Sequence, residues 1–101
     1  MNADALAWAA AAAVFAAGTG FLVLRRQLVA MVIGVELMVN AANILLVYTA
    51  ARRGDAEGFA AALLVLAAAA AEVVVGLTLI LAVRRGESES PETGHLKGLA
   101  G

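Results

Sequence analysis

The sequence lacks the residue types on which most bound redox and metal chemistry depends. None of its 101 residues is cysteine, and its single histidine, His95, lies in a polar stretch near the C-terminus. Without cysteine the chain forms no disulfide, iron–sulfur cluster or thiolate metal site, and one isolated histidine does not make a ligand set. We therefore expect neither a metal site nor a bound cofactor on this chain.

Charged residues are also scarce. The chain has seven Lys or Arg and eight Asp or Glu, 15% of its length, against 63% apolar residues, and its mean hydropathy is +0.93. This composition excludes a water-exposed enzyme, a disordered linker and a nucleic-acid-binding protein. It is typical of a membrane protein.

Three long apolar runs, residues 5–24, 28–51 and 59–83, make up most of the chain. At the helical rise of about 1.5 Å per residue they reach roughly 30, 36 and 38 Å, enough to cross a hydrocarbon core of about 30 Å. In lipid the backbone must satisfy its own hydrogen bonds, so the runs are predicted to be helices. Because residues 1–4 carry no basic charge, we expect the first run to be retained rather than cleaved as a signal peptide.

The predicted fold is an all-α membrane protein of three transmembrane helices, antiparallel in an up-down-up arrangement. The connecting segments, residues 25–27 and 52–58, are too short for any other order of neighbours. Residues 1–85 form the predicted transmembrane domain. Residues 86–101 are polar and lack a helical period, so we expect a mobile, solvated tail.

The basic residues predict the orientation of the chain in the membrane. Five of the seven fall on one side of the predicted bilayer: Arg25, Arg26, Arg84, Arg85 and Lys97. Since Lys and Arg accumulate on the cytoplasmic side, the N-terminus is predicted outside and the C-terminal tail in the cytoplasm. Trp8, Tyr48 and Phe59 all lie near the opposite boundary, where an aromatic belt would place them.

Two carboxyl groups interrupt the apolar runs. Glu36 and Glu72 lie about 12 and 16 Å from the predicted cytoplasmic boundary at helical rise, so they reach nearly the same level. A charged side chain at this depth costs roughly 2.5–3.5 kcal/mol on insertion scales. No Lys, Arg or His lies in the three runs, so each carboxyl must be protonated or be paired with a group or water of another subunit. Such a pair is suited to proton relay; the alternative is two inert, protonated side chains that hydrogen-bond neighbouring helices.

Other candidate residues surround these carboxyls. Asn40 and Asn43 share a helix face with Glu36, where they either hydrogen-bond another helix or order water toward the carboxyl. Arg25 and Arg26 act as an orientation signal with snorkelling side chains, or electrostatically at the mouth of a proton path or at a subunit contact. Gly18 and Gly20 are predicted to allow close helix packing.

The motifs resemble those of a known family. Residues 34–45, with the sequence GVELMVNAANIL, follow Arg25-Arg26-Gln27-Leu28 and resemble the second-helix signature of subunit K of bacterial proton-pumping NADH:quinone oxidoreductase, respiratory complex I. The mitochondrial counterpart is subunit 4L. Residues 69–77, AAAEVVVGL, resemble the third-helix motif of that family. The resemblance extends to about Arg85.

The resemblance implies a multi-pass subunit of the bacterial inner membrane that contacts other hydrophobic membrane-arm subunits, antiporter-like ones included. The family's proton-translocating glutamates correspond to Glu36 and Glu72, and its loop arginines to Arg25 and Arg26; Gln27 stands where asparagine is usual. NADH, FMN, iron–sulfur clusters and quinone would be bound by other subunits. The chain would then belong to an enzyme as a non-redox subunit, and alone it would catalyse nothing.

Four alternatives remain at this stage. The C subunit of multi-subunit sodium/proton antiporters has similar helices but typically lacks both glutamates, and it is the main alternative. Small multidrug transporters have four helices with the carboxyl in the first. ATP synthase ring subunits have two helices and one essential carboxyl. A purely structural membrane hairpin would not need carboxyls in the membrane at all.

Overall fold

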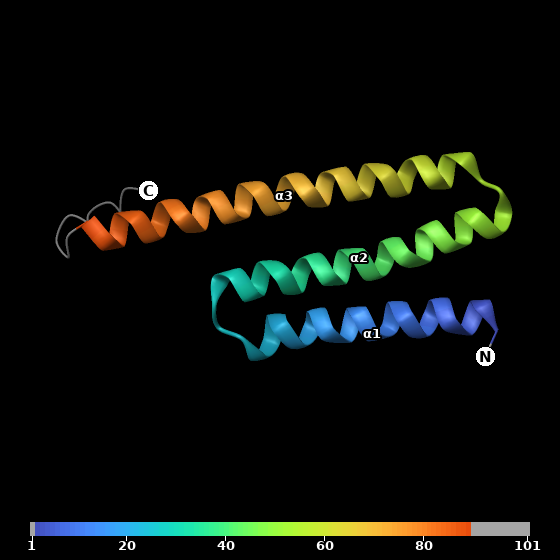
Figure 1. The fold of residues 1–101 in the computed structure, drawn as a ribbon, viewed down its shortest axis with the longest axis horizontal. Helices are drawn as coiled ribbons and strands as arrows, with labels where there is room; N and C mark the ends of the chain where they lie inside the picture. Colours follow the sequence, from blue (N-terminus) through green and yellow to red (C-terminus); the bar gives the residue numbers. More distant parts are fainter. Residues whose placement is uncertain (1, 90–101) are drawn as a thin grey trace.

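A computed structural model describes residues 2–89, and over this range the chain consists of three long helices (Figure 1). Helix α1 is Ala3–Leu24, α2 is Leu28–Arg53 and α3 is Ala56–Glu89. Each is long and apolar enough to cross a membrane. The predicted all-α membrane class is therefore confirmed, with helix boundaries a few residues wider than expected.

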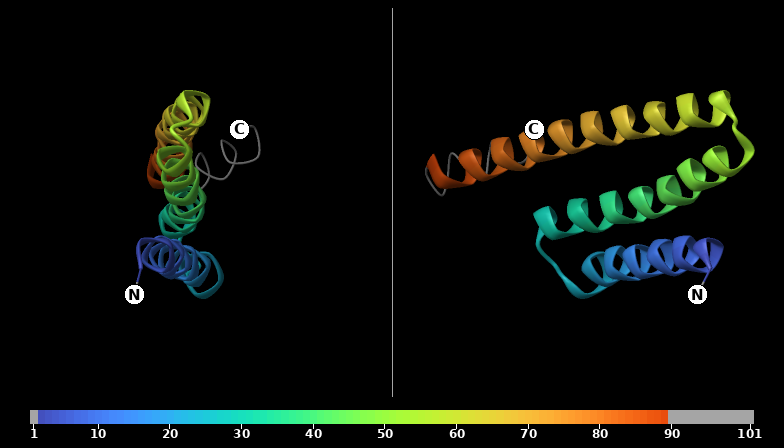
Figure 2. Two further views of the ribbon diagram at one scale, coloured as in Figure 1. Left: turned by 90° about the vertical axis from the view of Figure 1, so that its right-hand side faces the viewer. Right: turned by 45° about the vertical axis from the view of Figure 1, so that its right-hand side comes forward.

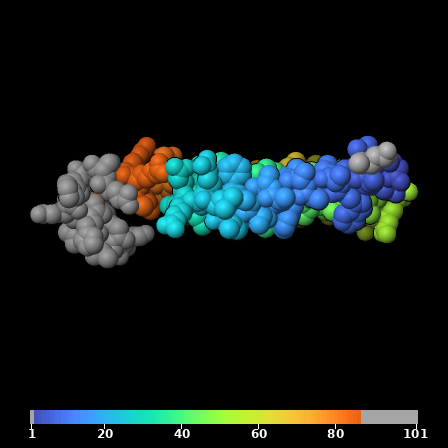
Figure 3. Space-filling view, turned by 90° about the horizontal axis from the view of Figure 1, so that it is seen from below, coloured from blue at the N-terminus to red at the C-terminus, as the bar shows by residue number. Residues whose placement is uncertain are grey.

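The three helices lie side by side in a single layer (Figures 1 and 2). Helix α2 is in the middle and contacts both neighbours, whereas α1 and α3 do not contact each other within residues 2–89. The molecule extends only 14 Å along its shortest axis, close to the diameter of one helix with its side chains, about 10–12 Å. Viewed from the α1 edge it is a narrow rod (Figure 3). Both broad faces of the layer are therefore open to neighbouring molecules.

Local sequence determines where the helices begin and end. Asn2 caps α1, because its side-chain oxygen accepts a hydrogen bond of 2.8 Å from the backbone N–H of Ala5. Gly54 closes α2 in the left-handed conformation, with φ of 63°. The carboxylate of Asp55 then accepts hydrogen bonds from the N–H groups of Glu57 and Gly58 at 3.0 and 3.2 Å. This cap begins α3 three residues earlier than expected.

The C-terminal end of α3 differs from the sequence-based prediction. The sequence predicts a helix that ends at residue 83 and a non-helical tail from residue 86, but α3 continues through Glu89. Extending an existing helix adds one hydrogen bond for each residue ordered, so a polar sequence can continue it. Pro91 is the first residue that lacks a backbone donor. The remainder of the predicted tail, residues 90–101, lies outside the described residues.

The contacts between helices are made by small side chains. The buried apolar residues are all alanines: Ala11, Ala30, Ala41, Ala50, Ala62 and Ala69. Among the described residues no large side chain is fully buried, and leucines, valines and aromatic residues point outward along all three helices. A soluble protein could not fold around such a core. In lipid, association depends instead on close backbone approach between small residues.

Two backbones approach each other closely at Gly18 of α1 and Gly34 of α2. A Cβ atom on Gly18 would lie 2.5 Å from the carbonyl oxygen of Gly34, and one on Gly34 would lie 2.6 Å from that of Gly18. The predicted close packing is confirmed at Gly18. It is wrong at Gly20, where a Cβ would meet nothing within 4 Å. Positions 18 and 20 differ by about 200° around a helix, so only one of them can face α2.

A polar cluster joins α1 and α2 at the end of the layer near the N-terminus. The Tyr48 hydroxyl and the Arg52 guanidinium both donate to the Asp4 carboxylate, and Arg52 Nη1 lies 3.3 Å from the Tyr48 oxygen. The sequence places Tyr48 only in the predicted aromatic belt. The spacing of Tyr48 and Arg52, one helical turn apart, is the signal that could have indicated the cluster. Because the Asp4 and Arg52 side chains are more than half exposed, the cluster orients the helix ends but stabilises them little.

Candidate functional site

The register of α2 against α3 places Glu36 opposite Glu72. Near the middle of the layer, a Cβ on Gly76 would be in ordinary van der Waals contact, 3.8 Å, with Cγ2 of Val32. One turn further along α2 from Val32 is Glu36. One turn back along α3 from Gly76 is Glu72. Since the helices are antiparallel, both steps lead in the same direction, and the two carboxyl-bearing residues lie level with each other, as predicted.

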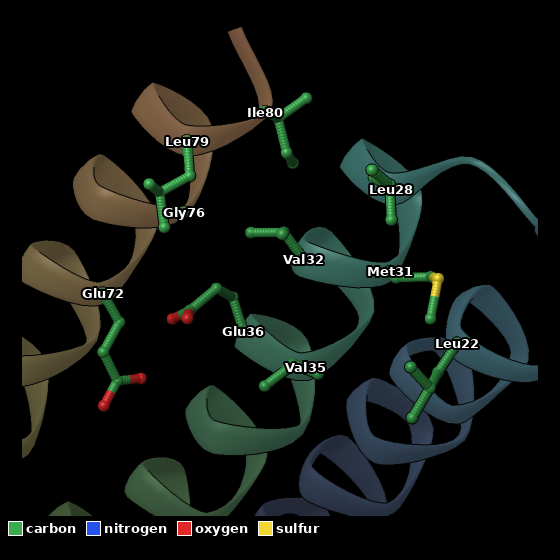
Figure 4. Close-up of a pocket in the computed structure, with 10 residues that line it drawn as sticks. All are labelled: Leu22, Leu28, Met31, Val32, Val35, Glu36, Glu72, Gly76, Leu79 and Ile80. Atoms are coloured by element: carbon green, nitrogen blue, oxygen red, sulfur yellow. The ribbon is translucent and has the colours of Figure 1, made fainter. Parts of the chain in front are cut away.

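Both glutamates line one groove, whose volume is about 460 Å³. In Figure 4, Glu36 extends from α2 toward α3, and the Glu72 carboxyl lies in the same gap. The rest of the lining is apolar: Leu22, Leu28, Met31, Val32, Val35, Gly76, Leu79 and Ile80. The structure therefore brings together the two residues that the sequence singled out, in a setting with little polar surface.

The burial of the two carboxyls is less complete than the sequence suggested. Glu36 is half-buried, and Glu72 is exposed on the surface of the chain. The reason is the single-layer arrangement, in which α3 is covered on one side only, by α2. Within residues 2–89, neither carboxyl has a hydrogen-bond or ion-pair partner. Any group that pairs with them must come from outside residues 2–89.

The two asparagines have different surroundings. Asn43 Nδ2 donates a hydrogen bond of 3.3 Å to the backbone oxygen of Ala62 on α3, while its Oδ1 is buried without a partner among the described residues. Asn40 is exposed. Both line a second groove of about 530 Å³, together with Ile44, Val47, Tyr48 and Ala51. Of the two predicted roles, interhelical hydrogen bonding is therefore found for Asn43.

The second groove opens on the other broad face of the layer. Val35 lines the glutamate groove and Ile44 lines the asparagine groove. They are nine residues apart, which at about 100° per residue places them on opposite sides of α2. Asn40 therefore does not point into the space that holds the two carboxyls, although it lies one turn from Glu36.

Arg25 and Arg26 lie in the loop between α1 and α2 and are exposed. The Arg25 guanidinium lies 6.0 Å from the centroid of the Phe21 ring, at the outer limit of a cation–π contact. Within residues 2–89, neither arginine pairs with Glu36 or Glu72. This position is compatible with each of the predicted roles.

The chemistry available at the glutamate groove is proton exchange. Two carboxyls in one largely apolar groove can bind and release protons. In the part of the chain that the structure describes, no group of three His, Cys, Asp or Glu could hold a metal ion. Fold and site together define a small integral-membrane subunit that carries two ionisable groups and needs other helices around it.

Comparison with known proteins identifies the family. The family of NADH-ubiquinone/plastoquinone oxidoreductase chain 4L matches residues 6–96, and the chain belongs to it. An NADH-quinone oxidoreductase subunit K of Thermus thermophilus is 45% identical over 92 residues, which cover 91% of this chain and 95% of the relative. Subunit K 2 of Syntrophobacter fumaroxidans is 45% identical over 87 residues, covering 85% and 76%. The subunit K of Deinococcus radiodurans is 43% identical over 86 residues, covering 85% and 80%. No solved structure gives a significant match.

Membership confirms the resemblance to subunit K that the second- and third-helix motifs indicated. The two carboxyl positions lie within the matched region. The relatives are named as subunits of NADH-quinone oxidoreductase, not of antiporters. The chain is accordingly a membrane subunit of the complex I type.

Proposed function

We propose that this chain is a membrane-arm subunit of a proton-translocating NADH:quinone oxidoreductase in which Glu36 and Glu72 pass protons within the membrane. The observation that carries the proposal is the shared groove: two carboxyls at one level, on adjacent helices, with apolar walls and no partner among residues 2–89. An ionisable pair in a membrane protein is costly, and its usual reason is function.

The other candidate residues have supporting roles in this proposal. Asn40 and Asn43 support the site from a neighbouring groove of α2, and Asn43 does so through its hydrogen bond to α3. Arg25 and Arg26 supply positive charge at the cytoplasmic end of α1. NADH, FMN, iron–sulfur clusters and quinone belong to other subunits. The partners are other hydrophobic membrane-arm subunits, including antiporter-like ones, together with lipid.

Dependence on partner subunits gives the first test. When this chain carries an affinity tag, it is expected to purify together with other membrane subunits and with NADH:quinone reductase activity. The isolated chain is expected to have no activity and to be unstable as a monomer, because both broad faces expose apolar side chains and two unpaired carboxyls. A stable monomer that transports protons after reconstitution would contradict the proposal.

We also propose that the chain lies in the bacterial inner membrane with its N-terminus outside and its C-terminus in the cytoplasm. Arg25 and Arg26, at the end of α1, then lie on the same side as Arg84 and Arg85, near the end of α3. The positive-inside rule supports this orientation.

Reporter fusions test the orientation directly. After Arg85, a reporter that works only in the cytoplasm is expected to be active, and a reporter that works only outside the cell is expected to be inactive. After Arg53, the opposite result is expected. The fusion after Arg53 is the internal control, since it ends after one fewer membrane crossing. The reverse pattern would show that the chain is inserted the other way round.

A further inference from the structure

We propose that Asn43 is a positioning residue, whose side-chain amide holds α3 in the register that brings Glu36 and Glu72 into one groove. The inference rests on the proposed function of the two carboxyls. It concerns the geometry of the helix pair, which can be measured separately from proton movement.

The position of the Asn43 hydrogen bond suits this task. Within residues 2–89, the bond of 3.3 Å from Asn43 Nδ2 to the Ala62 oxygen is the single side-chain hydrogen bond between α2 and α3. It lies between the turn at Gly54 and the glutamate groove. Along α2, Asn43 is seven residues from Glu36, about two turns, and therefore lies on the same side of the helix.

The two-residue connection of Gly54 and Asp55 fixes where α3 begins, but the contacts beyond it do not define the register well at the level of the glutamates. Close to the turn, a Cβ on Gly58 would meet Ala50, and further along Gly76 lies near Val32. Contacts between such small apolar groups allow close approach but are not directional. A slip of one helical turn, about 5.4 Å, would bring Ala68 or Gly76 opposite Glu36 in place of Glu72. A hydrogen bond to one backbone carbonyl opposes that slip.

The unpaired oxygen of Asn43 supports a specific role for this side chain. Its Oδ1 is buried and has no hydrogen-bond partner in the described part of the chain. Burying an unpaired polar group is unfavourable, so an apolar residue would fit the lipid environment better. A single buried asparagine that lowers stability while fixing helix register is well known from coiled coils. Here Nδ2 of Asn43 makes the directional hydrogen bond to α3, and the unpaired Oδ1 accounts for the loss of stability.

The absence of cysteine from the chain makes the register measurable. A Cβ at position 76 would lie 3.8 Å from Val32 Cγ2, and Cγ2 stands where the sulfur of a cysteine at position 32 can lie, so cysteines at the two positions would be close neighbours on facing helices. Val32→Cys and Gly76→Cys, introduced together, should therefore form an internal disulfide in membranes that contain the assembled complex. The rate of its formation, followed by gel mobility under mild oxidation, reports how well α3 is held at the level of the carboxyls.

In this double-cysteine background, Asn43→Leu should slow disulfide formation by about 3- to 20-fold, the range that interhelical hydrogen bonds in membranes support. Asn43→Ala should do the same, and it serves if the leucine variant does not accumulate. Asn43→Gln retains an amide donor and should restore most of the rate. Asn40→Leu is the matched control, because Asn40 is the same residue type one turn away and makes no hydrogen bond to α3. The control should leave the rate unchanged.

Turnover completes the test. In the chain without the introduced cysteines, Asn43→Leu should lower quinone-reductase turnover per assembled complex, and Asn43→Gln should restore it. If Asn43 were only structural, its replacement would change the amount of assembled complex but not the turnover. An unchanged disulfide rate in Asn43→Leu, or an equal slowing by Asn40→Leu, would overturn the positioning role. Normal pumping without both carboxyls would instead refute the proposed function and leave the register result standing.

Discussion

Replacing both Glu36 and Glu72 by glutamine is expected to abolish proton pumping while the complex still assembles. Glutamine keeps the size and hydrogen bonding of the side chain but has no exchangeable acidic proton. Proton transfer by positioned side chains typically contributes a factor of about 100 or more to a rate, so coupled quinone reduction and pumping should fall together by that order. Inside-out membrane vesicles allow both rates to be measured in one preparation.

The two single variants show how much each glutamate contributes to pumping. Glu36→Gln should come close to the double variant. Glu72→Gln should be milder, because Glu72 is the more exposed of the pair and we expect water or Glu36 to replace it in part. Thr78→Val is the matched control: it also removes a polar group from a membrane-spanning helix, but the Thr78 hydroxyl bonds only to its own helix, at Val74. If the glutamates merely held helices together, glutamine would serve as well as the acid, and near-normal pumping in the double variant would establish that.

Infrared spectra of the assembled complex can show which glutamate carries a proton at rest. A protonated carboxyl has a stretching band that a carboxylate lacks. Loss of this band in Glu36→Gln but not in Glu72→Gln would assign the resting proton to Glu36, and the reverse result to Glu72.

The second large effect is expected at the contact between α1 and α2. Gly34→Ala should lower the amount of assembled complex strongly, because the new methyl group would lie 2.6 Å from the Gly18 oxygen and 2.9 Å from the Leu22 nitrogen. Both are backbone atoms, so the clash cannot be relieved by a change of side-chain rotamer. Overpacking of this kind typically costs about 1–3 kcal/mol, and Gly34→Leu should prevent assembly. Native gels of solubilised membranes give the measurement.

Gly20→Ala provides the control for this prediction. It adds the same methyl group to a nearby glycine, but in open space, since nothing lies within 4 Å of that position. Alanine also favours the helix over glycine by up to about 1 kcal/mol, so assembly should be unchanged or slightly better. Equal assembly of Gly34→Ala and Gly20→Ala would mean that α1 and α2 separate at no cost, contrary to the close approach described above.

Much of the fold could be predicted from the sequence because the membrane imposes strong constraints. Run length and hydropathy determined the number of helices, and the short connections determined their order. The level match of Glu36 and Glu72 followed from counting residues from the loops, since helical rise is constant.

The arrangement of the helices in one layer could not be predicted in the same way. A soluble helix reveals its buried face through the periodicity of its apolar residues, whereas a membrane helix is apolar all round. The exposure of Glu72 and the difference between Gly18 and Gly20 both depend on which side of a helix meets α2, and hydropathy carries no such signal. The early start of α3 depended on a side-chain cap by Asp55 that run length ignores.

A layer one helix thick is a subunit without an interior. Among the described residues no large side chain is fully buried, and the alanine contacts between helices bury little area of their own. The free energy that keeps the chain folded is then inseparable from the free energy of binding its neighbours, as in obligate oligomers. In the cell, an unassembled copy remains exposed to quality-control proteases. We therefore expect the steady-state abundance of this chain to follow the supply of its partner subunits more closely than its own rate of synthesis.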